Sequence, residues 1–176
     1  MTLTAVFAAL YVVINIVQSF SVGNPTIFGP VQLRIADCLI ALAALFGLPV
    51  AFGVTVGWFL SNTYSFLGPA DIILGPIVNL LAATAVLLLR RRKLLACAAG
   101  GLIVGVSVGS YLAVLFSFTP PELLSSLPPV LGMILSLTIS SLIAVGIIGY
   151  ALLVGLSRPN ILKPLKSYGL KTVSDG

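Results

Sequence analysis

Few side chains in this sequence could do chemistry, and most of them are carboxylates, amides and aromatic rings. The chain has no histidine, so the commonest general base and metal ligand is missing. The groups that remain suit binding through hydrogen bonds and ring stacking. The candidates are Gln32, Arg34, Asp37, Trp58, Asn62, Asp71, Asn79, Tyr111 and Glu122.

Motifs of known catalytic chemistry are missing from the sequence. It contains no Walker A loop, so it cannot hydrolyse ATP in the P-loop manner, and no G-x-S-x-G, H-E-x-x-H or C-x-x-C pattern. Cys38 and Cys97 lie far apart in apolar runs and are expected to be buried free thiols, with a disulfide as the alternative. A catalytic site formed by the two carboxylates of Asp37 and Asp71 stays an alternative. We do not expect an enzyme, a metal site or a bound cofactor.

The composition places these residues in a membrane protein. Hydrophobic residues make up 59% of the chain and charged residues 7%, whereas a soluble domain carries about 25% charged residues. A helix needs about 20 apolar residues to cross a bilayer. The sequence therefore predicts an all-α integral membrane protein, with one domain of six transmembrane helices over residues 1–156 and a basic tail over residues 157–176.

Glycine, proline and charged residues separate the apolar runs. Pro25 and Pro30 interrupt the first long connection, and Gly68 and Pro69 mark a later turn. The first run has no Lys or Arg before it, which argues against a cleaved signal peptide. The second run is short, so it could tilt or lie partly at the interface. The six predicted spans cover residues 3–17, 33–46, 49–66, 71–89, 94–118 and 130–156.

The basic residues predict which end of the bundle faces the cytoplasm. Residues 90–93 form a run of four, four more cations lie in the tail, and Arg34 is the ninth. Because cytoplasmic loops are enriched in Lys and Arg, we expect the basic turn, the tail and both termini in the cytoplasm of a plasma-membrane protein. Arg34, Asp37, Asp71 and Glu122 then gather toward the outer face.

A cluster at one face predicts a cup that is open to the outside, because a channel needs a polar lining through its full depth. Each member also has a simpler interpretation. Arg34 and Asp37 share a helix face and could simply pair with each other. Trp58 could belong to an interfacial aromatic belt together with Tyr64. Asn79 could make a hydrogen bond between helices.

Small residues recur every fourth position in three of the predicted spans. Such stripes let helices approach closely where lipid supplies no hydrophobic driving force. We expect the stripes in the fifth and sixth spans to pack inside the bundle, and Ala5 and Ala9 in the first span to serve packing or a partner protein. The two internal stripes are Gly101, Gly105 and Gly109, and Gly132, Ser136, Ser140 and Ala144.

Several segments in the first half of the chain resemble the QueT family. They are GPVQLRIAD at residues 29–37, the Gly-Leu-Pro at residues 47–49, Gly57 with Ser61 and Asn62, and GPADIILG at residues 68–75. The resemblance is good over about residues 1–90, and the later spans match by length and order. QueT proteins are substrate-binding S components of energy-coupling factor (ECF) transporters, so the resemblance implies a six-helix S-component bundle.

The resemblance also implies a substrate and partners. The substrate would be a queuosine precursor, a 7-deazaguanine base. A transmembrane T component would dock on Ala5 and Ala9, and two separate ATPase subunits would use the ATP. The loaded S component would tilt in the membrane and release its substrate inward.

A deazaguanine base suits the candidate side chains. Carboxylates can accept hydrogen bonds from its guanine-like edge, amides can satisfy its carbonyl, and aromatic rings can stack on it. We therefore expect Asp71 and Glu122 as carboxylate contacts, Arg34 and Asp37 to hold the first outer loop, and Trp58 and Tyr111 to stack. The expected amide contacts are Gln32, Asn62 and Asn79. Alternatives are an S component for another vitamin or nucleobase, and a stand-alone transporter.

Overall fold

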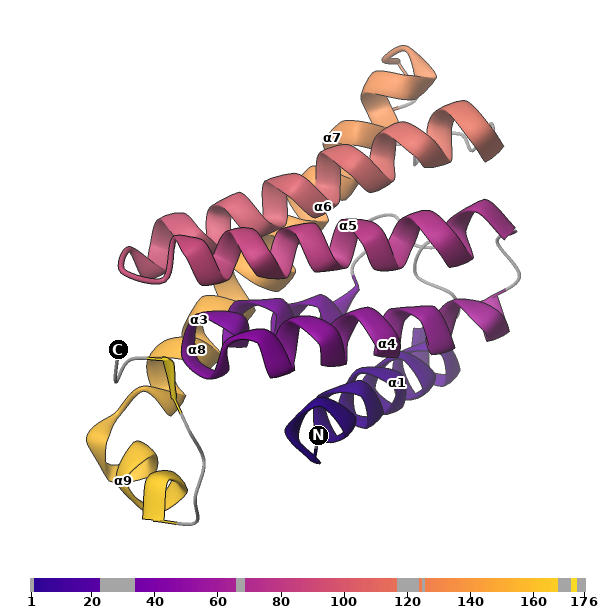
Figure 1. Cartoon of the computed structure of the whole chain (residues 1–176). Coiled ribbons are helices and arrows are strands. Elements are labelled where there is room, and N and C mark those ends of the chain that lie inside the picture. Colours follow the sequence, from indigo (N-terminus) through magenta and orange to yellow (C-terminus); the bar gives the residue numbers. More distant parts are fainter. Residues whose placement is uncertain are drawn as a thin grey trace.

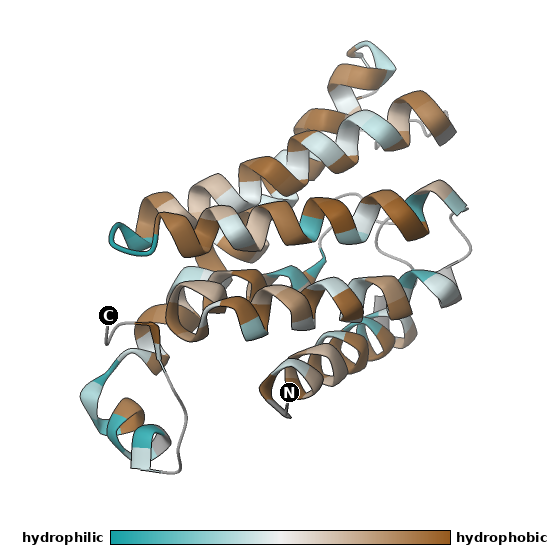
Figure 2. Cartoon of the chain, viewed as in Figure 1, coloured by the Kyte–Doolittle hydropathy of each residue, from teal (hydrophilic) through white to brown (hydrophobic). Residues whose placement is uncertain are grey.

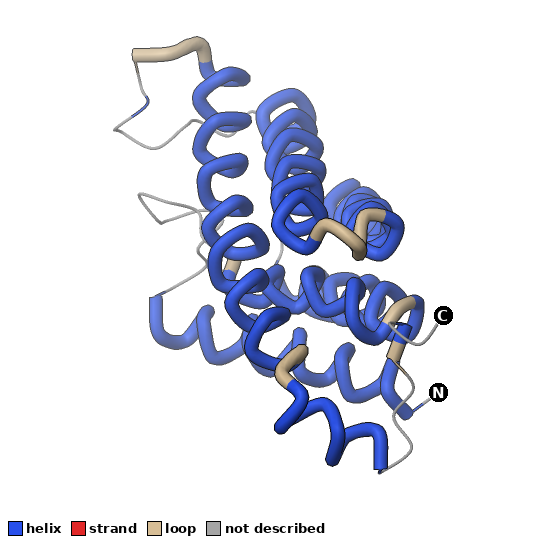
Figure 3. The backbone as a smooth tube through the Cα atoms, turned by 90° about the vertical axis from the view of Figure 1, so that its left-hand side faces the viewer, coloured by secondary structure: helices blue, strands red, loops and turns tan. Residues whose placement is uncertain are grey.

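The protein is helical throughout the part that its structure, a computed structural model, describes. That part comprises residues 2–22, 34–65, 69–116, 124, 126–167 and 172–173, and no strand occurs in it. The all-α prediction is therefore confirmed for these residues, and Figure 3 shows helices joined by connections. The helices are α1 (Thr2–Val22), η1 (Ile35–Leu42), α3 (Ala43–Phe46), α4 (Leu48–Ser65), α5 (Pro69–Leu88), α6 (Lys93–Phe116), α7 (Pro129–Ser141), η3 (Leu142–Gly149), α8 (Tyr150–Leu156) and α9 (Pro159–Ser167).

Four helical stretches of the described chain are long and apolar enough to cross a membrane. All six predicted runs are helical where they are described, but the count of six spans stays a prediction, because Ile35–Phe46 is shorter and α4 is less apolar. Figure 2 shows the hydrophobic residues along the long helices and hydrophilic ones at the α5–α6 turn and on α9. The four stretches are Leu3–Phe20, Pro69–Leu88, Lys93–Leu115 and Pro129–Leu156.

The basic turn lies at one end of the bundle. In Figure 1 the turn between α5 and α6, which carries Arg90 and Arg91, is at the left, and α8 ends near it. The end of α4 and the start of α5 lie at the right of the same view. Helices α4 and α5 therefore run antiparallel, and Asp71 in the first turn of α5 is at the end opposite the basic turn.

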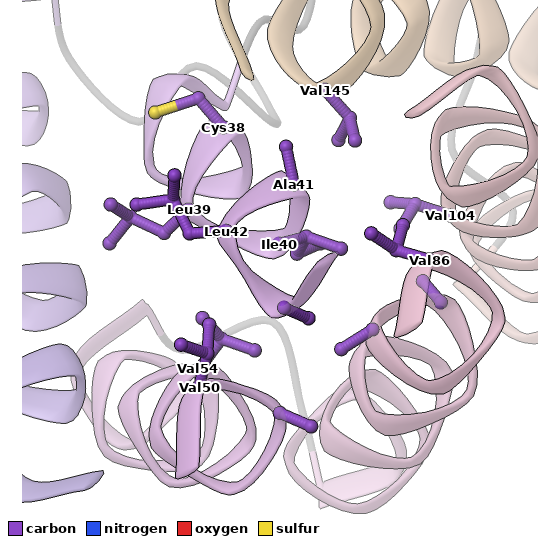
Figure 4. Packing of buried hydrophobic residues seen from close by; sticks show 14 of the residues in the cluster. Cys38, Leu39, Ile40, Ala41, Leu42, Val50, Val54, Val86, Val104 and Val145 are labelled. Atoms are coloured by element: carbon purple, nitrogen blue, oxygen red, sulfur yellow. The ribbon is translucent and has the colours of Figure 1, made fainter. Parts of the chain in front are cut away.

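The short second run forms the centre of the molecule. Residues 36–46 are all buried within the bundle, and whether this run tilts or lies partly at the membrane interface stays a prediction. In Figure 4, Ile40 of η1 lies among Val54 of α4, Val86 of α5 and Val104 of α6. A 3₁₀ helix rises about 2.0 Å and an α-helix about 1.5 Å per residue, so η1 and α3 span about 22 Å. This length is less than the thickness of a hydrocarbon core, about 30 Å. Arg34 at the start of η1 is itself buried inside the bundle.

Close helix packing explains the glycines of α6. A Cβ atom at Gly109 would lie 2.7 Å from the Cα of Ile134, and a Cβ at Gly105 would collide with the backbone of Thr138. The expected packing of this stripe inside the bundle is confirmed, with α7 as the neighbour. The stripe in the sixth span is also buried, although Ile134 and Thr138 beside it make the contacts to the glycines.

Candidate functional site

The candidate site begins at the seam between α4 and α5. At its outermost point, the Asn62 Nδ2 donates to the backbone oxygen of Asp71 at 3.0 Å. Deeper in the bundle, the Asn79 Nδ2 donates to the backbone oxygen of Val54 at 3.2 Å. Asn79 follows Asp71 by eight residues, or about 12 Å along the helix. The two antiparallel helices therefore carry polar side chains from one end of the bundle well into its interior.

Trp58 lies between these two levels and is surrounded by the chain itself. Its side chain is 1% exposed, so the aromatic-belt interpretation is wrong for this residue. The Arg34 guanidinium carbon lies 4.4 Å from the centroid of the Trp58 ring, and the Tyr11 ring stacks at 6.3 Å between centroids with 23° between planes. Gly75 leaves room for the indole, since any Cβ there would collide with it. A desolvated cation–π contact contributes about 2 kcal/mol.

Two tyrosines from different helices bind the two buried carboxylates. The Tyr11 hydroxyl of α1 donates to Asp37 at 2.6 Å, and the Tyr111 hydroxyl of α6 donates to Asp71. The charge of Arg34 lies close enough to interact with both carboxylates. Arg34 is therefore not the exclusive partner of Asp37, as the simple pairing would have it. Tyr111, expected as a stacking residue, acts here through its hydroxyl.

Four polar atoms along this seam are buried without a hydrogen-bond partner among the described residues. They comprise two acceptors, Asp71 Oδ2 and Asn79 Oδ1, one donor, Trp58 Nε1, and the hydroxyl of Ser61. A buried polar group without a partner costs about 1–3 kcal/mol, so buried polar groups in folded proteins are normally satisfied by protein, water or ligand. Together these atoms can accept hydrogen bonds from N–H groups and donate one to an acceptor. This is the chemistry that a polar heterocycle requires.

The structure brings together most of the residues that the sequence singled out. Arg34, Asp37, Trp58, Asn62 and Asp71 are buried at the seam or beside it. Asn79 and Tyr111 are buried there too, and the interhelical hydrogen bond expected for Asn79 is confirmed. The predictions for Gln32 and Glu122, and for the Tyr64 side chain, lie outside the described residues.

Sequence reasoning missed the contribution of the first helix. Tyr11 binds Asp37, and Gln18 accepts a hydrogen bond from the backbone N–H of Ile35 at 3.0 Å through its Oε1. The signal was present, because Tyr11, Asn15 and Gln18 recur at helical spacing on one face of an otherwise apolar helix. The position of the first residues of η1 therefore depends on contacts from α1 as well as from α4.

The opposite face of α1 has little packed against it. Ala5 and Ala9 are exposed, while Phe7 and Tyr11 are buried. Of the residues in the α1 span, 22% are buried, against 44% to 50% in the other three candidate spans. The AxxxA face is therefore available to a partner and does not serve packing within the described bundle.

The described residues contain no group of three or more Cys, Asp or Glu side chains that could hold a metal ion. Cys38 and Cys97 are free and buried, so the prediction of free thiols is confirmed.

A comparison with protein-family models matches residues 1–158 of the chain to the QueT transporter family. Searches of curated proteins and of solved structures each found no match. The family match covers every helix that lines the seam and agrees with the long apolar helices. The chain therefore belongs to the QueT transporter family. It is a multi-pass membrane protein that acts in transport, and it is not an enzyme.

Proposed function

We propose that the chain is the substrate-binding S component of an ECF-type importer and that it takes up a queuosine precursor, a 7-deazaguanine base. Membership of the QueT transporter family supports a transport role. The chain has no Walker A motif, so ATP hydrolysis falls to two partner ATPase subunits. Ordered polar groups gather at the seam, far from the basic turn, as expected for capture at the outer face.

The observation that carries the substrate proposal is the state of Asp71. This carboxylate is fully buried, one oxygen accepts from Tyr111, and Oδ2 makes no hydrogen bond among the described residues, although the charge of Arg34 is nearby. The pyrimidine edge of a guanine-like base presents adjacent N–H donors that a carboxylate oxygen can accept. The Asn79 Oδ1 and the Trp58 Nε1 supply a further acceptor and a donor.

The remaining residues receive supporting roles. Trp58, whose ring already contacts Arg34 and Tyr11, offers its indole N–H to the base in place of the stacking expected from the sequence. Asn62 holds the start of α5 through Asp71, and Arg34 and Asp37 order the start of η1. Gln32 and Glu122 stay proposed substrate contacts on the evidence of the sequence.

The proposed assembly uses the exposed side of α1, which faces away from the rest of the bundle. The exposed Ala5 and Ala9 are small enough to let another helix approach closely, which supports docking of the transmembrane T component there. The proposal includes six spans, with both termini in the cytoplasm. After docking, the loaded chain tilts and releases its substrate inward.

Titration of the purified chain tests the substrate. We expect a 7-deazaguanine base to raise the unfolding temperature, and Asp71→Asn to weaken its binding by about tenfold or more, since a hydrogen bond to a charged group contributes about 1.5–3 kcal/mol. Asp175→Asn is the matched control, because it removes one carboxylate from the tail. Stabilisation by a vitamin and not by the deazaguanine would favour the alternative S component.

Uptake by cells tests the transport class. We expect accumulation of the labelled base to require the T component and the ATPases together with this chain. Undiminished uptake in cells that lack those partners would show a stand-alone transporter instead. Ala5→Leu with Ala9→Leu should abolish uptake while leaving binding by the purified chain intact, since both positions are exposed.

A further inference from the structure

A second polar site lies at the opposite end of the bundle, at the basic turn. A pocket of about 290 Å³ opens between this turn, α3, α8 and α9. Arg90, Arg91 and Lys93 line one side of it, and Arg90 is half-buried. The substrate site does not use these residues.

The three cations of this pocket have no acidic neighbour among its described lining residues. The chain has four acidic residues, of which Asp37 and Asp71 belong to the seam and Glu122 and Asp175 lie outside the described residues. Lys93 is also the first residue of the 24-residue helix α6, so the positive end of that helix dipole adds to the three cations.

The rest of the lining is mostly apolar. Leu45 of α3, Leu153 of α8, Leu162 of α9 and Val173 belong to it, together with the polar Ser157. Helix α9 carries Lys163 and Lys166 on an exposed side while Leu162 turns inward, as in helices that lie at a membrane surface. An occupant must therefore offer an anion to the cations and hydrocarbon to the leucines. A free inorganic anion satisfies the first requirement alone.

We propose that this pocket binds the phosphate group of an anionic phospholipid, with the adjoining part of an acyl chain against the apolar side. Basic pockets between helices at a membrane surface bind anionic headgroups in this way. The lipid ties the α5–α6 turn to α3, α8 and α9. The site is independent of the substrate and of the partner subunits.

The test is a titration of phosphatidylglycerol into the detergent-purified full chain, with bound lipid counted by native mass spectrometry. Phosphatidylcholine with the same chains is the neutral comparison. Each cation near a membrane surface contributes about fivefold in affinity for anionic lipid, so we expect the triple variant R90Q/R91Q/K93Q to bind phosphatidylglycerol on the order of a hundredfold more weakly. Binding of phosphatidylcholine should not change.

A matched control separates the pocket from general surface charge. The variant R158Q/K163Q/K166Q removes the same number of cations, none of which lines the pocket, and it should stay within about fivefold of the native chain. Equal losses in the two triple variants, or equal affinity of the native chain for both lipids, would overturn the site. Glycerol phosphate serves as the anion without an acyl chain. If it raised the unfolding temperature of the chain as much as phosphatidylglycerol does, the lipid would be overturned as the occupant.

Discussion

At the scale of single residues, the seam depends on hydroxyl groups that satisfy buried carboxylates. Asp37 and Asp71 are buried in an apolar bundle, where a carboxyl group persists if it is paired or hydrogen-bonded. Each receives a tyrosine hydroxyl from another helix, and Arg34 supplies the positive charge. The network orders side chains in advance of binding and leaves the Asp71 Oδ2 for a ligand.

Removing one hydroxyl should therefore destabilise the protein. Tyr11→Phe removes the hydroxyl that donates to Asp37, and we expect the free energy of unfolding to fall by about 1–3 kcal/mol. The unfolding temperature can be followed with a maleimide dye that reacts with Cys38 and Cys97 once they are exposed. Tyr150→Phe is the control, because no hydrogen bond involves its hydroxyl among the described residues. Equal unfolding temperatures for the two variants would contradict the assigned role of Tyr11.

Gly75 should matter for ligand binding through Trp58. A Cβ in Gly75→Ala collides with the indole, which has to move away from Arg34 and Tyr11. The displaced indole no longer presents its N–H to the base, and a hydrogen bond contributes about 0.5–1.5 kcal/mol, so we expect affinity for the deazaguanine base to fall about two- to tenfold. Calorimetric titration measures the change. Gly146→Ala is the control, since its nearest contact would be an ordinary 3.9 Å, and native affinity in Gly75→Ala would argue against a role for Trp58.

At the scale of elements, two features decide the bundle. The central η1 is enclosed by α4, α5, α6 and η3. Packing against these helices explains how a run too short to cross a bilayer can lie inside the bundle. Gly47, with φ of 74°, makes the sharp turn from α3 into α4 that a residue with a Cβ adopts rarely. Glycines in turn set how closely α6 lies to α7.

The packing of α6 on α7 gives a prediction at this scale. Gly105→Ala places a methyl group against the Thr138 backbone, which cannot yield without moving a helix, so we expect a loss of about 2–3 kcal/mol. The same substitution at Gly155 of α8 meets nothing within 4 Å and should be neutral or slightly stabilising, because alanine is the better helix former. Thermal unfolding with the cysteine-reactive dye compares them. A Gly105→Ala protein as stable as Gly155→Ala would refute close packing at this contact.

At the scale of the whole molecule, charge separates the two ends. The basic turn and α9 lie at one end, and the first turn of α5, which carries Asp71, lies at the other (Figures 1 and 2). The proposed orientation, in which segments rich in Lys and Arg face the cytoplasm, puts the basic turn inside and the seam toward the outer face. Under that proposal, the substrate seam and the phospholipid pocket belong to opposite surfaces of the membrane.

Labelling with an impermeant maleimide tests this orientation. On intact cells we expect Glu122→Cys to react and Arg91→Cys to react only after lysis, because positive residues stay in the cytoplasm. The native chain is the control, since Cys38 and Cys97 are buried. Reaction of both introduced cysteines from the same side would remove the basis for the outer site and for the direction of transport.

The sequence by itself determined the class of structure and the family. Sparse charge forces a protein of this hydrophobicity into lipid, proline and glycine mark the ends of helices, and Trp58 and Asn62 share a face by spacing alone. The segments around Asp37 and Asp71 indicated the QueT family, which the family match confirms. These properties are local or compositional, so no knowledge of long-range contacts was needed.

Tertiary structure alone decided which polar groups meet. Tyr11 binds a carboxylate 26 positions away and Tyr111 one 40 positions away, and no periodicity within a helix reports such a contact. The same holds for Arg34, whose position over the Trp58 ring of another helix could not be read from its spacing to Asp37. A buried central η1 also could not be read from a short apolar run, because burial depends on which helices surround it.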